Sequence, residues 1–438
     1  MTIYSSDDQI DVASIILAGG KGTRLHPLTQ TRCKPDVLFG GRYRLIDIPI
    51  SSSINSNINN IFVISQYLSS HLNQHIKETY SLSVHTKTKI TALTPEEKTD
   101  IQTWYNGTAD AVRKNLEHIL EIDAKYYLIL SGDHLYSMDL RRLLRFADAK
   151  DADLTIASIP ICKEEASRMG LLKINSESYI SDFFEKPTDE KVLERFKMPK
   201  ELSHGSFFSK DQEDSYLASM GIYVFKRKVL VDLLEQVQGD DFGHDIIPHF
   251  VGKQGKTAAY IYNGYWEDIG TISSYYRASM ELLSQEIGLN FYNDAKPIYS
   301  QIVNLPCPLI TDTVVRNSII CDGSIIKGKE IINSMIGLRA YILEGSIIKD
   351  SIIMGNPHYM HEKGDLPTEV GHFTVGQNCY IEKAIIDEGA QIGHNVRLVN
   401  SENIDHLDCE HICIRDGIII VKAGAKIPDH TTLDSLAA

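Results

Sequence analysis

A glycine-rich segment with nearby cations is the first feature of the sequence that could carry chemistry. It reads LAGGKGTRL from Leu17 to Leu25, and Lys34 follows before a proline. Backbone N–H groups of such a loop can approach a phosphate closely, and Arg and Lys side chains neutralise its charge. It is not a P-loop, because Thr23 follows Gly22, and it lacks the third glycine of the dinucleotide fingerprint. We expect a phosphate-binding loop, with a tight turn carrying surface cations as the alternative.

A carboxylate after an apolar run is the second candidate. Asp133 lies in LSGDH (130–134), and Asp268 lies in YWEDIGT (265–271). Mg²⁺ prefers one or two carboxylates together with substrate phosphate oxygens, so these two residues are the predicted metal ligands. Taken alone, Asp133 is as well explained as a turn or N-cap aspartate.

Apolar runs alternating with helix-like stretches must position these residues. The segments 14–20, 60–67, 126–136 and 153–161 predict strands, and apolar residues at helical spacing predict a helix over 109–123. This order predicts an α/β domain with parallel strand pairing. Ligands of such sheets bind at the carboxyl ends of the strands, so the glycine loop, Gln66 and Asp133 should meet at one edge.

After about residue 300 the apolar residues recur every six positions, with small or turn residues between them. This short period predicts a parallel β-helix whose recurring residues point inward, and an antiparallel sandwich is the alternative. The segment 355–372 breaks the period and predicts a loop leaving one coil. We expect a catalytic domain over 1–290 and a β-helix domain for oligomerisation and regulation over 291–438. The recurring residues are Val314, Ile320, Ile326, Ile332, Leu338, Ile386, Ile392 and Leu398.

The charge balance excludes several classes of partner. The 438 residues hold 44 Lys and Arg against 58 Asp and Glu, a net charge of −14. A chain this acidic lacks the basic face that nucleic acids or anionic membranes require. No apolar run approaches the roughly 20 residues that span a bilayer. We expect a cytoplasmic protein, because the N-terminal segment has neither signal-peptide nor transit-peptide character.

The cysteines indicate reduced thiols rather than a disulfide framework, because their number is odd, seven, and they are scattered. His406, Cys409, His411 and Cys413 form a tight group. Its spacing matches no standard zinc finger, so buried thiols are expected and zinc ligation is the alternative.

The motifs together resemble the ADP-glucose pyrophosphorylases, that is, the glucose-1-phosphate adenylyltransferases. The similarity extends from residue 17 to 271, and the six-residue repeats resemble the C-terminal domain of that family. The glycine loop and SGD are shared by sugar-nucleotide pyrophosphorylases in general, whereas WYNGTADAV and YRLIDIPIS are more specific to the adenylyl-transferring branch. The matching stretches are LAGGKGTRLHPLTQTRCKP, YRLIDIPISSSINSNI, WYNGTADAV, SGDHLY, FFEKP, SMGIYVF, DFGHDIIP and YWEDIGT.

The resemblance implies a fold, a reaction and partners. The fold would be a Rossmann-like nucleotidyltransferase domain with a mixed sheet of the GT-A type, followed by a left-handed β-helix of hexapeptide repeats. The reaction would convert ATP and glucose 1-phosphate to ADP-glucose and pyrophosphate with Mg²⁺, as the committed step of glycogen or starch synthesis. A homotetramer controlled by anionic metabolites is expected.

The resemblance also implies residue roles. Arg24, Lys34 and Asp133 would be catalytic, and Asp133 and Asp268 would bind the metal. Glucose 1-phosphate would meet Tyr105, Gly170, Glu185, Lys186 and Ser219. The nucleotide would meet Leu17, Gly19, Gly20, Gly22, Thr23, Gln66, Gly107 and Thr108. Effector contacts would involve Arg32, Arg44, Arg415 and Lys422.

One departure and several alternatives remain. Asp36 stands where the family usually has alanine, and we expect it to temper the charge of Lys34. The chain could instead be a non-catalytic regulatory subunit of a heterotetramer, although Arg24, Lys34, Asp133 and Asp268 are all present. A pyrophosphorylase for another nucleotide or sugar, or an acyltransferase built on the β-helix, are further alternatives.

Overall fold

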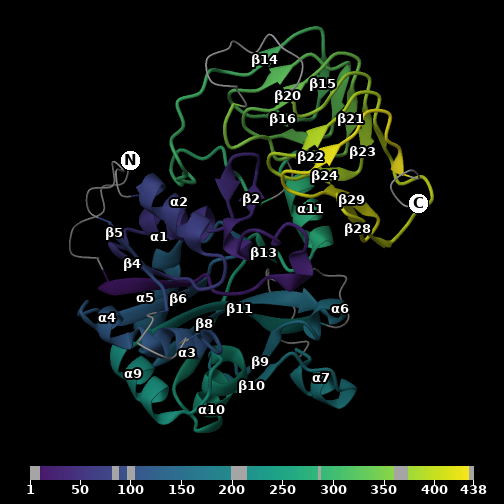
Figure 1. Ribbon diagram of the computed structural model, residues 1–438. Helices are drawn as coiled ribbons and strands as arrows, with labels where there is room; N and C mark the ends of the chain where they lie inside the picture. The colour runs from purple at the N-terminus through teal and green to yellow at the C-terminus, as the bar shows by residue number, and fades with distance from the viewer. Residues whose placement is uncertain are drawn as a thin grey trace.

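A computed structural model describes residues 10–80, 88–95, 104–198, 215–284, 288–359 and 373–433. A sheet flanked by helices forms one half, and a solenoid of short strands forms the other (Figure 1). The predicted loop at 355–372 lies outside the described residues from residue 360 onward, as do residues 1–9. No described helix combines the length and apolar character needed to cross a membrane.

The sheet of the first half is mixed, as the family resemblance implies, whereas the order of the elements alone predicts parallel pairing. Its centre is parallel: β1 pairs with β4 and β6, and β4 pairs with β5. β11 runs antiparallel to β6 and to β8. In spatial order the strands are β10 (Ile180–Glu185), β9 (Gly170–Ile174), β11 (Ser215–Lys226), β6 (Tyr126–Ser131), β1 (Val12–Leu17), β4 (Asn60–Ile64) and β5 (Lys89–Leu93), with β8 (Leu154–Cys162) and β12 (Thr257–Ile261) paired beside β11.

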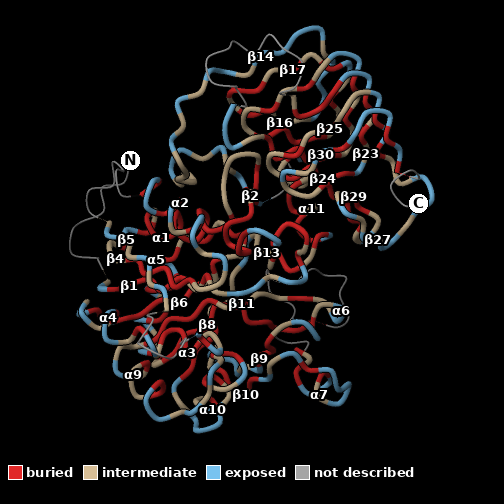
Figure 2. Tube along the Cα trace, viewed as in Figure 1, coloured by how far each residue is buried: buried red, intermediate tan, exposed pale blue. Residues whose placement is uncertain are grey.

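Both faces of the sheet are buried. Alternate residues of β1 point to opposite faces, so Ala13 and Ile15 join one apolar cluster and Val12 and Ile16 join the other. Figure 2 shows the buried residues (red) concentrated along these strands and inside the solenoid. The described helices of this half are α1 (Asp47–Asn55), α2 (Ser70–Tyr80), α3 (Thr108–Lys114), α4 (Leu116–Leu120), α5 (Leu140–Lys150), α6 (Lys163–Ala166), α7 (Glu190–Phe196), α9 (Arg227–Gln236), α10 (Ile247–Gly252) and α11 (Ile272–Glu281). Of these, α11 packs in the core shared with the β-helix.

The helix predicted over 109–123 is divided into α3 and α4. The break falls at Asn115, whose backbone leaves the helical region at φ −105° and ψ 9°. Its side-chain amide donates to the carbonyl of Ala111 and to the hydroxyl of Tyr105. An asparagine that bonds to the backbone one turn earlier competes with helix propagation, which explains the break.

The second half is a parallel β-helix. Ile325 pairs with Tyr341, and Met335 pairs with Ile352, so each coil lies in register on the next. Its strands are β14 (Leu309–Ile310), β15 (Val314–Arg316), β16 (Ile319–Ile320), β17 (Ile325–Ile326), β18 (Glu330–Ile332), β19 (Met335–Ile336), β20 (Tyr341–Ile342), β21 (Ile347–Lys349), β22 (Ile352–Ile353), β23 (Tyr380–Glu382), β24 (Ala384–Ile386), β25 (Gln391–Ile392), β26 (Arg397–Leu398) and β30 (Lys426–Ile427).

The inward positions differ in part from the predicted ones. The coils that these pairs define are slightly shorter than three steps of six, so a strict period of six drifts off the core within one coil. Val314 is therefore exposed, and Ile332 and Leu338 are only partly buried. Ile320 packs against the core from a partly buried position. The predicted inward residues Ile326, Ile386, Ile392 and Leu398 are buried, and Ile331, Ile336, Ile342, Ile348, Ile353 and Ile381 join them.

The solenoid changes to antiparallel pairing near its end. β27 (His406–Asp408) pairs with β28 (Ile412–Arg415), and β28 pairs with β29 (Ile418–Val421). β29 still pairs in parallel with β24, so this meander extends one face of the β-helix. A repeat of six does not predict it.

The two halves share an apolar core and a buried ion pair. Leu25 and Tyr275 of the first half cluster with Ile385 and Ile420 of the β-helix. The Arg32 side chain, 6% exposed, lies 3.2 Å from the Asp387 carboxylate and 3.4 Å from that of Glu388. Burial raises the pKa of Asp387 to about 6, against the opposing effect of Arg32. Arg32 therefore anchors its loop to the solenoid, and the same loop carries Lys34.

Breaking this pair should destabilise the fold. Arg32→Met leaves Asp387 buried without a cation, so we expect a loss of about 3–5 kcal/mol in the free energy of unfolding. Chemical denaturation measures it. Arg32→Met combined with Asp387→Leu should recover much of the loss. Arg42→Met is the control, because the exposed pair of Arg42 with Asp322 should contribute under about 1 kcal/mol. Equal effects of Arg32→Met and Arg42→Met would contradict the importance of the buried pair.

Candidate active site

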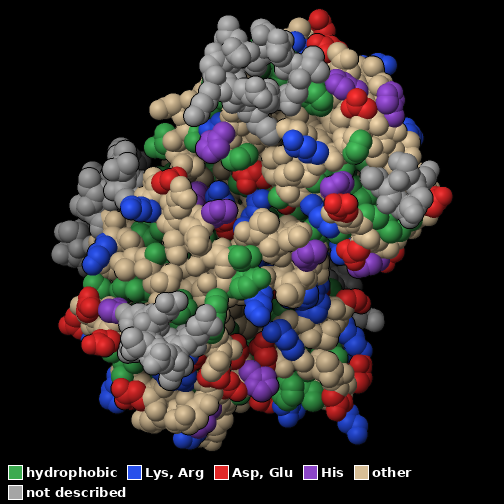
Figure 3. All heavy atoms as spheres, in the orientation of Figure 1, with side chains coloured by type: hydrophobic (Ala, Val, Ile, Leu, Met, Phe, Trp, Pro, Cys, Tyr) green, Lys and Arg blue, Asp and Glu red, His purple; other side chains and the backbone are tan. Residues whose placement is uncertain are grey.

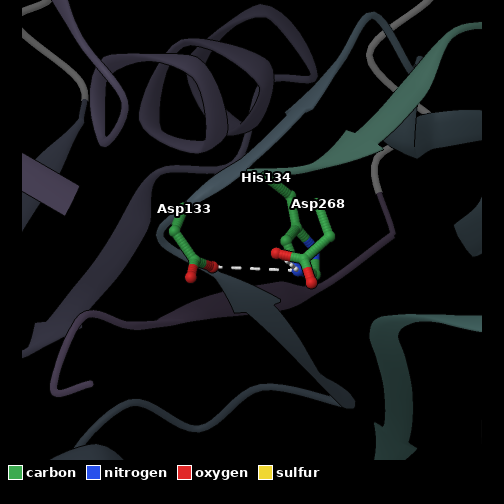
Figure 4. Close-up of side chains that lie close together, drawn as sticks. All are labelled: Asp133, His134 and Asp268. Atoms are coloured by element: carbon green, nitrogen blue, oxygen red, sulfur yellow. Dashed lines mark ion pairs between the residues drawn. The ribbon is translucent and has the colours of Figure 1, made fainter. Parts of the chain in front are cut away.

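A short antiparallel ribbon brings the two predicted metal ligands together. Asp133 follows β6 in the turn before β7 (His134–Tyr136), and β7 pairs with β13 (Trp266–Asp268) so that His134 faces Asp268. The ligand atoms of Asp133, His134 and Asp268 all lie within 4.8 Å of one another. Figure 4 shows the three side chains converging, with His134 Nε2 3.7 Å from Asp133 and 3.8 Å from Asp268.

Lys34 lies between the two carboxylates. Its Nζ is 2.5 Å from Asp133 Oδ2 and 3.2 Å from Asp268 Oδ1. Burial alone would raise the pKa of Asp133, but Lys34 and His134 hold that pKa well below its usual range. Burial would likewise lower the pKa of Lys34, but the two carboxylates raise it. The site is therefore a cation held between two carboxylates.

The glycine loop packs directly on Lys34. Gly22 has φ 62°, and a Cβ there would lie 2.8 Å from Lys34 Cβ. Glycine is required by both the left-handed backbone and this close approach. The Thr29 hydroxyl donates to the Gly22 carbonyl at 2.9 Å and fixes the turn. Loop and lysine are thus one unit at the carboxyl end of β1.

A cavity of about 580 Å³ opens beside this unit. It lies at the carboxyl ends of β1, β4 and β6, where the strand order predicts a ligand site. Lys and Arg side chains gather beside a hollow near the centre of the molecule in Figure 3. Of the residues with predicted roles, the cavity is lined by Leu17, Gly19, Gly20, Lys34, Gln66, Tyr105, Gly107, Thr108, Asp133, Gly170, Glu185, Lys186, Ser219 and Asp268.

The far wall of the cavity holds an acid and a cation at the end of β10. Glu185 and Lys186 lie 2.9 Å apart as an ion pair. A Cβ on Gly170 or Gly243 would lie 2.5 or 2.8 Å from Glu185 Oε2, so both glycines leave room for this carboxylate. Lys186 has φ 47°, an unfavourable backbone for a lysine before proline. Strain of this kind is typical of functional positions.

The nucleotide-side residues are tied to one another. Gln66 Nε2 donates to the Gly19 carbonyl at 3.3 Å, and Gln66 Oε1 accepts from the Tyr105 N–H at 2.8 Å. A Cβ on Gly107 would lie 2.4 Å from the Asp240 carbonyl, so only glycine fits there. The Thr108 hydroxyl donates to Asp241 at 3.0 Å. The backbone around Gly19, around Tyr105 to Thr108 and around Asp240 therefore forms one wall of the cavity.

Three predicted catalytic or nucleotide residues, Gly22, Thr23 and Arg24, lie outside the cavity lining. Thr23 and Arg24 are exposed on the short turn after the glycine loop. Arg24 Nη2 would lie 3.5 Å from a Cβ on Gly270, which places it at the rim beside β13.

The four predicted effector residues are each bound within the chain. Arg44 Nη1 lies 2.5 Å from Asp36 Oδ1, and Arg415 Nη2 lies 2.6 Å from Asp408. Lys422 Nζ donates to the carbonyls of Cys409 and Glu410. Arg32 is buried against Asp387. Asp36 therefore pairs with Arg44 rather than contacting Lys34, contrary to our expectation.

The Cys/His group near the C-terminus does not gather as a metal site in the part of the chain that the structure describes. Among the described residues, the side chains that come close enough to share a metal ion are those of Asp133, His134 and Asp268. Cys413 is buried and donates to Asp408 at 3.2 Å, and burial raises the pKa of its thiol to about 11. His406 is exposed.

Several cavity residues were not predicted from the sequence. His134 lies in the stretch SGDHLY and Asp241 begins the stretch DFGHDIIP, so both had a sequence signal although neither was given a role. Trp266 lies two residues before Asp268 and could have been found by that position. Arg168 had no such signal, because its segment joins the site only through the folding of the sheet. Ser219, which was predicted, lies at a bulge in the pairing of β11 with β8 and lines the cavity.

The fold and the site define a nucleotidyltransferase joined to a left-handed β-helix. The family model described as nucleotidyl transferase matches residues 13–285, and that described as the GLGC left-handed parallel beta-helix domain matches residues 304–432. A Triticum aestivum protein named glucose-1-phosphate adenylyltransferase small subunit, chloroplastic/amyloplastic, is 39% identical over 96% of this chain and 91% of that protein. The chain belongs to the glucose-1-phosphate adenylyltransferase family. The predicted family and fold class are confirmed, and the domain boundary near residue 290 stays a prediction.

Proposed function

We propose that the chain transfers the adenylyl group of ATP to α-D-glucose 1-phosphate, giving ADP-glucose and pyrophosphate for glycogen or starch synthesis. The observation that carries the proposal is Lys34 held between Asp133 and Asp268 beside the glycine loop. The cavity next to it has the size of a nucleotide-sugar site. On the far wall, Glu185 supplies a carboxylate that can accept hydrogen bonds from sugar hydroxyls, and Lys186 supplies a cation that can bind the sugar phosphate.

The reaction needs positioning and charge neutralisation more than proton transfer. The nucleophile is a phosphate oxygen of glucose 1-phosphate, and the second pKa of a phosphate monoester is about 6, so no general base is required. The obstacle is the approach of two anions in line. Lys186 would hold the sugar phosphate, Glu185 the sugar hydroxyls, and Lys34 and Arg24 the phosphates of ATP.

The carboxylates suit Mg²⁺. Asp133 and Asp268 offer hard oxygen ligands, and the Lys34 ammonium already satisfies their charge, so the space between them accepts a cation. When bound there, Mg²⁺ would neutralise charge on the reacting phosphate. Lys34 would then be released from the carboxylates to contact phosphate oxygens.

Partners and location stay predictions. We retain a homotetramer, while the name of the Triticum aestivum protein, which calls it a small subunit, favours a second kind of chain. Anionic effectors at Arg32, Arg44, Arg415 and Lys422 would have to displace the contacts that these residues make. A cytoplasmic location stays a prediction beside a relative named as chloroplastic/amyloplastic.

Purified chain should release pyrophosphate from ATP and glucose 1-phosphate. The assay crosses ATP, UTP, GTP and dTTP with glucose 1-phosphate, and the highest kcat/KM is expected for ATP. Preference for another nucleotide would overturn the adenylyl assignment. No release with any nucleotide would favour the regulatory subunit instead.

Asp133→Asn should lower kcat on the order of 10³-fold, because the charge that holds the metal is lost. Steady-state kinetics at saturating Mg²⁺ measures the loss, and chelation should abolish wild-type turnover reversibly. Asp139→Asn, at the N-cap of α5 and outside the cavity, is the control. Near-normal turnover of Asp133→Asn would remove the metal assignment.

Lys186→Ala should raise KM for glucose 1-phosphate while kcat is nearly kept. Such a change is expected when Lys186 binds the substrate equally strongly in the ground state and in the transition state. The exposed Lys191→Ala on α7 is the control and should change neither constant. A large fall in kcat at unchanged KM would contradict a binding role for Lys186.

A further inference from the structure

Arg168 lines the cavity and has no role in the site described so far. It follows α6 and precedes β9, and its N–H donates to the Glu165 carbonyl at 3.0 Å, so a folded turn carries it. This turn and the turn of Arg24 reach the same place from different parts of the chain.

Arg168 and Arg24 meet at Gly270. A Cβ on Gly270 would lie 3.7 Å from Arg168 Nη2 and 3.5 Å from Arg24 Nη2. Gly270 closely follows Asp268 in the chain, and its N–H donates to the Asp268 carbonyl at 2.8 Å. Two guanidinium groups therefore converge at Gly270, two residues after the predicted metal ligand Asp268.

Neither guanidinium is neutralised by the described residues of the protein. Within that part of the chain, no carboxylate lies within ion-pairing distance of Arg24 or Arg168. Lys34 and Lys186 in the same cavity are paired with acids. Both side chains are exposed beside the cavity, so water solvates them when no ligand is bound. In a chain with net charge −14, two adjacent cations without a carboxylate partner among the described residues form a local site that favours an anion.

We propose that Arg168 binds, together with Arg24, the pyrophosphoryl group that ATP contributes and the reaction releases; this inference rests on the proposed function. An arginine fork binds phosphate oxygens in pairs, and a diphosphate is long enough to engage two forks. The pair lies at Gly270, two residues after Asp268, on the metal side of the cavity. Lys186 belongs to the sugar side, so the phosphate of glucose 1-phosphate has its own cation.

The test compares Arg168→Ala, Arg168→Lys and Lys173→Ala. Lys173 is an exposed residue of β9 outside the cavity, so its removal matches the change in net charge. In the direction that forms ATP from ADP-glucose and pyrophosphate, Arg168→Ala should raise KM for pyrophosphate at least tenfold. KM for ATP should rise in the forward direction, while KM for glucose 1-phosphate stays within twofold. Arg168→Lys should restore part of the loss.

Calorimetric titration of each folded variant with inorganic pyrophosphate and Mg²⁺ gives a second readout. It measures binding and does not depend on turnover. Weaker binding to Arg168→Ala than to wild type and Lys173→Ala supports the proposal. Unchanged pyrophosphate binding, or a rise only in KM for glucose 1-phosphate, overturns it. A wild-type chain that binds pyrophosphate through Arg168 but makes no ADP-glucose would overturn the proposed function and keep the pyrophosphate site.

Discussion

The contact on which the site depends is the ammonium group of Lys34 between the carboxylates of Asp133 and Asp268. Each charge is expensive to bury alone, so the three groups must be brought together by the folded chain. The β7–β13 ribbon supplies the carboxylates, and Gly22 supplies the close packing on the lysine stem. A cation of the protein therefore occupies the place between the carboxylates, and these two carboxylates are the residues that would hold the proposed metal ion.

The same short segment couples this contact to the β-helix. Arg32 and Lys34 are close neighbours in the chain, yet one is buried against Asp387 of the solenoid and the other reaches the active-site carboxylates. Asp36, a little further on, is bound to Arg44. Apolar residues of both halves share one core around this segment, so the loop that carries Lys34 is packed directly against the solenoid.

The distribution of charge resolves the contrast between an acidic chain and polyanionic substrates. Lys34 and Lys186 are held by acids, which keeps these cations oriented and limits their repulsion while no substrate is bound. Arg24 and Arg168 differ, since among the described residues their charge faces Gly270 without a carboxylate. The cavity lining holds four Lys or Arg residues and four Asp or Glu residues, so its charge is balanced although the chain as a whole is acidic. A balanced cavity opposes the entry of anionic substrates less than the acidic chain as a whole would.

The sequence by itself determined the glycine loop, the two aspartates, the α/β order and the solenoid, because each depends on neighbouring residue types or a short period. Only the tertiary structure decided which partners the charges take. Asp36 pairs with Arg44, the helix over 109–123 breaks at Asn115, and the true length of the coils shifts the inward positions away from Val314. Arg168 joins the site for the same reason: side chains distant in the chain are neighbours only when strand pairing and coil length bring their backbones together, and no local pattern records that distance.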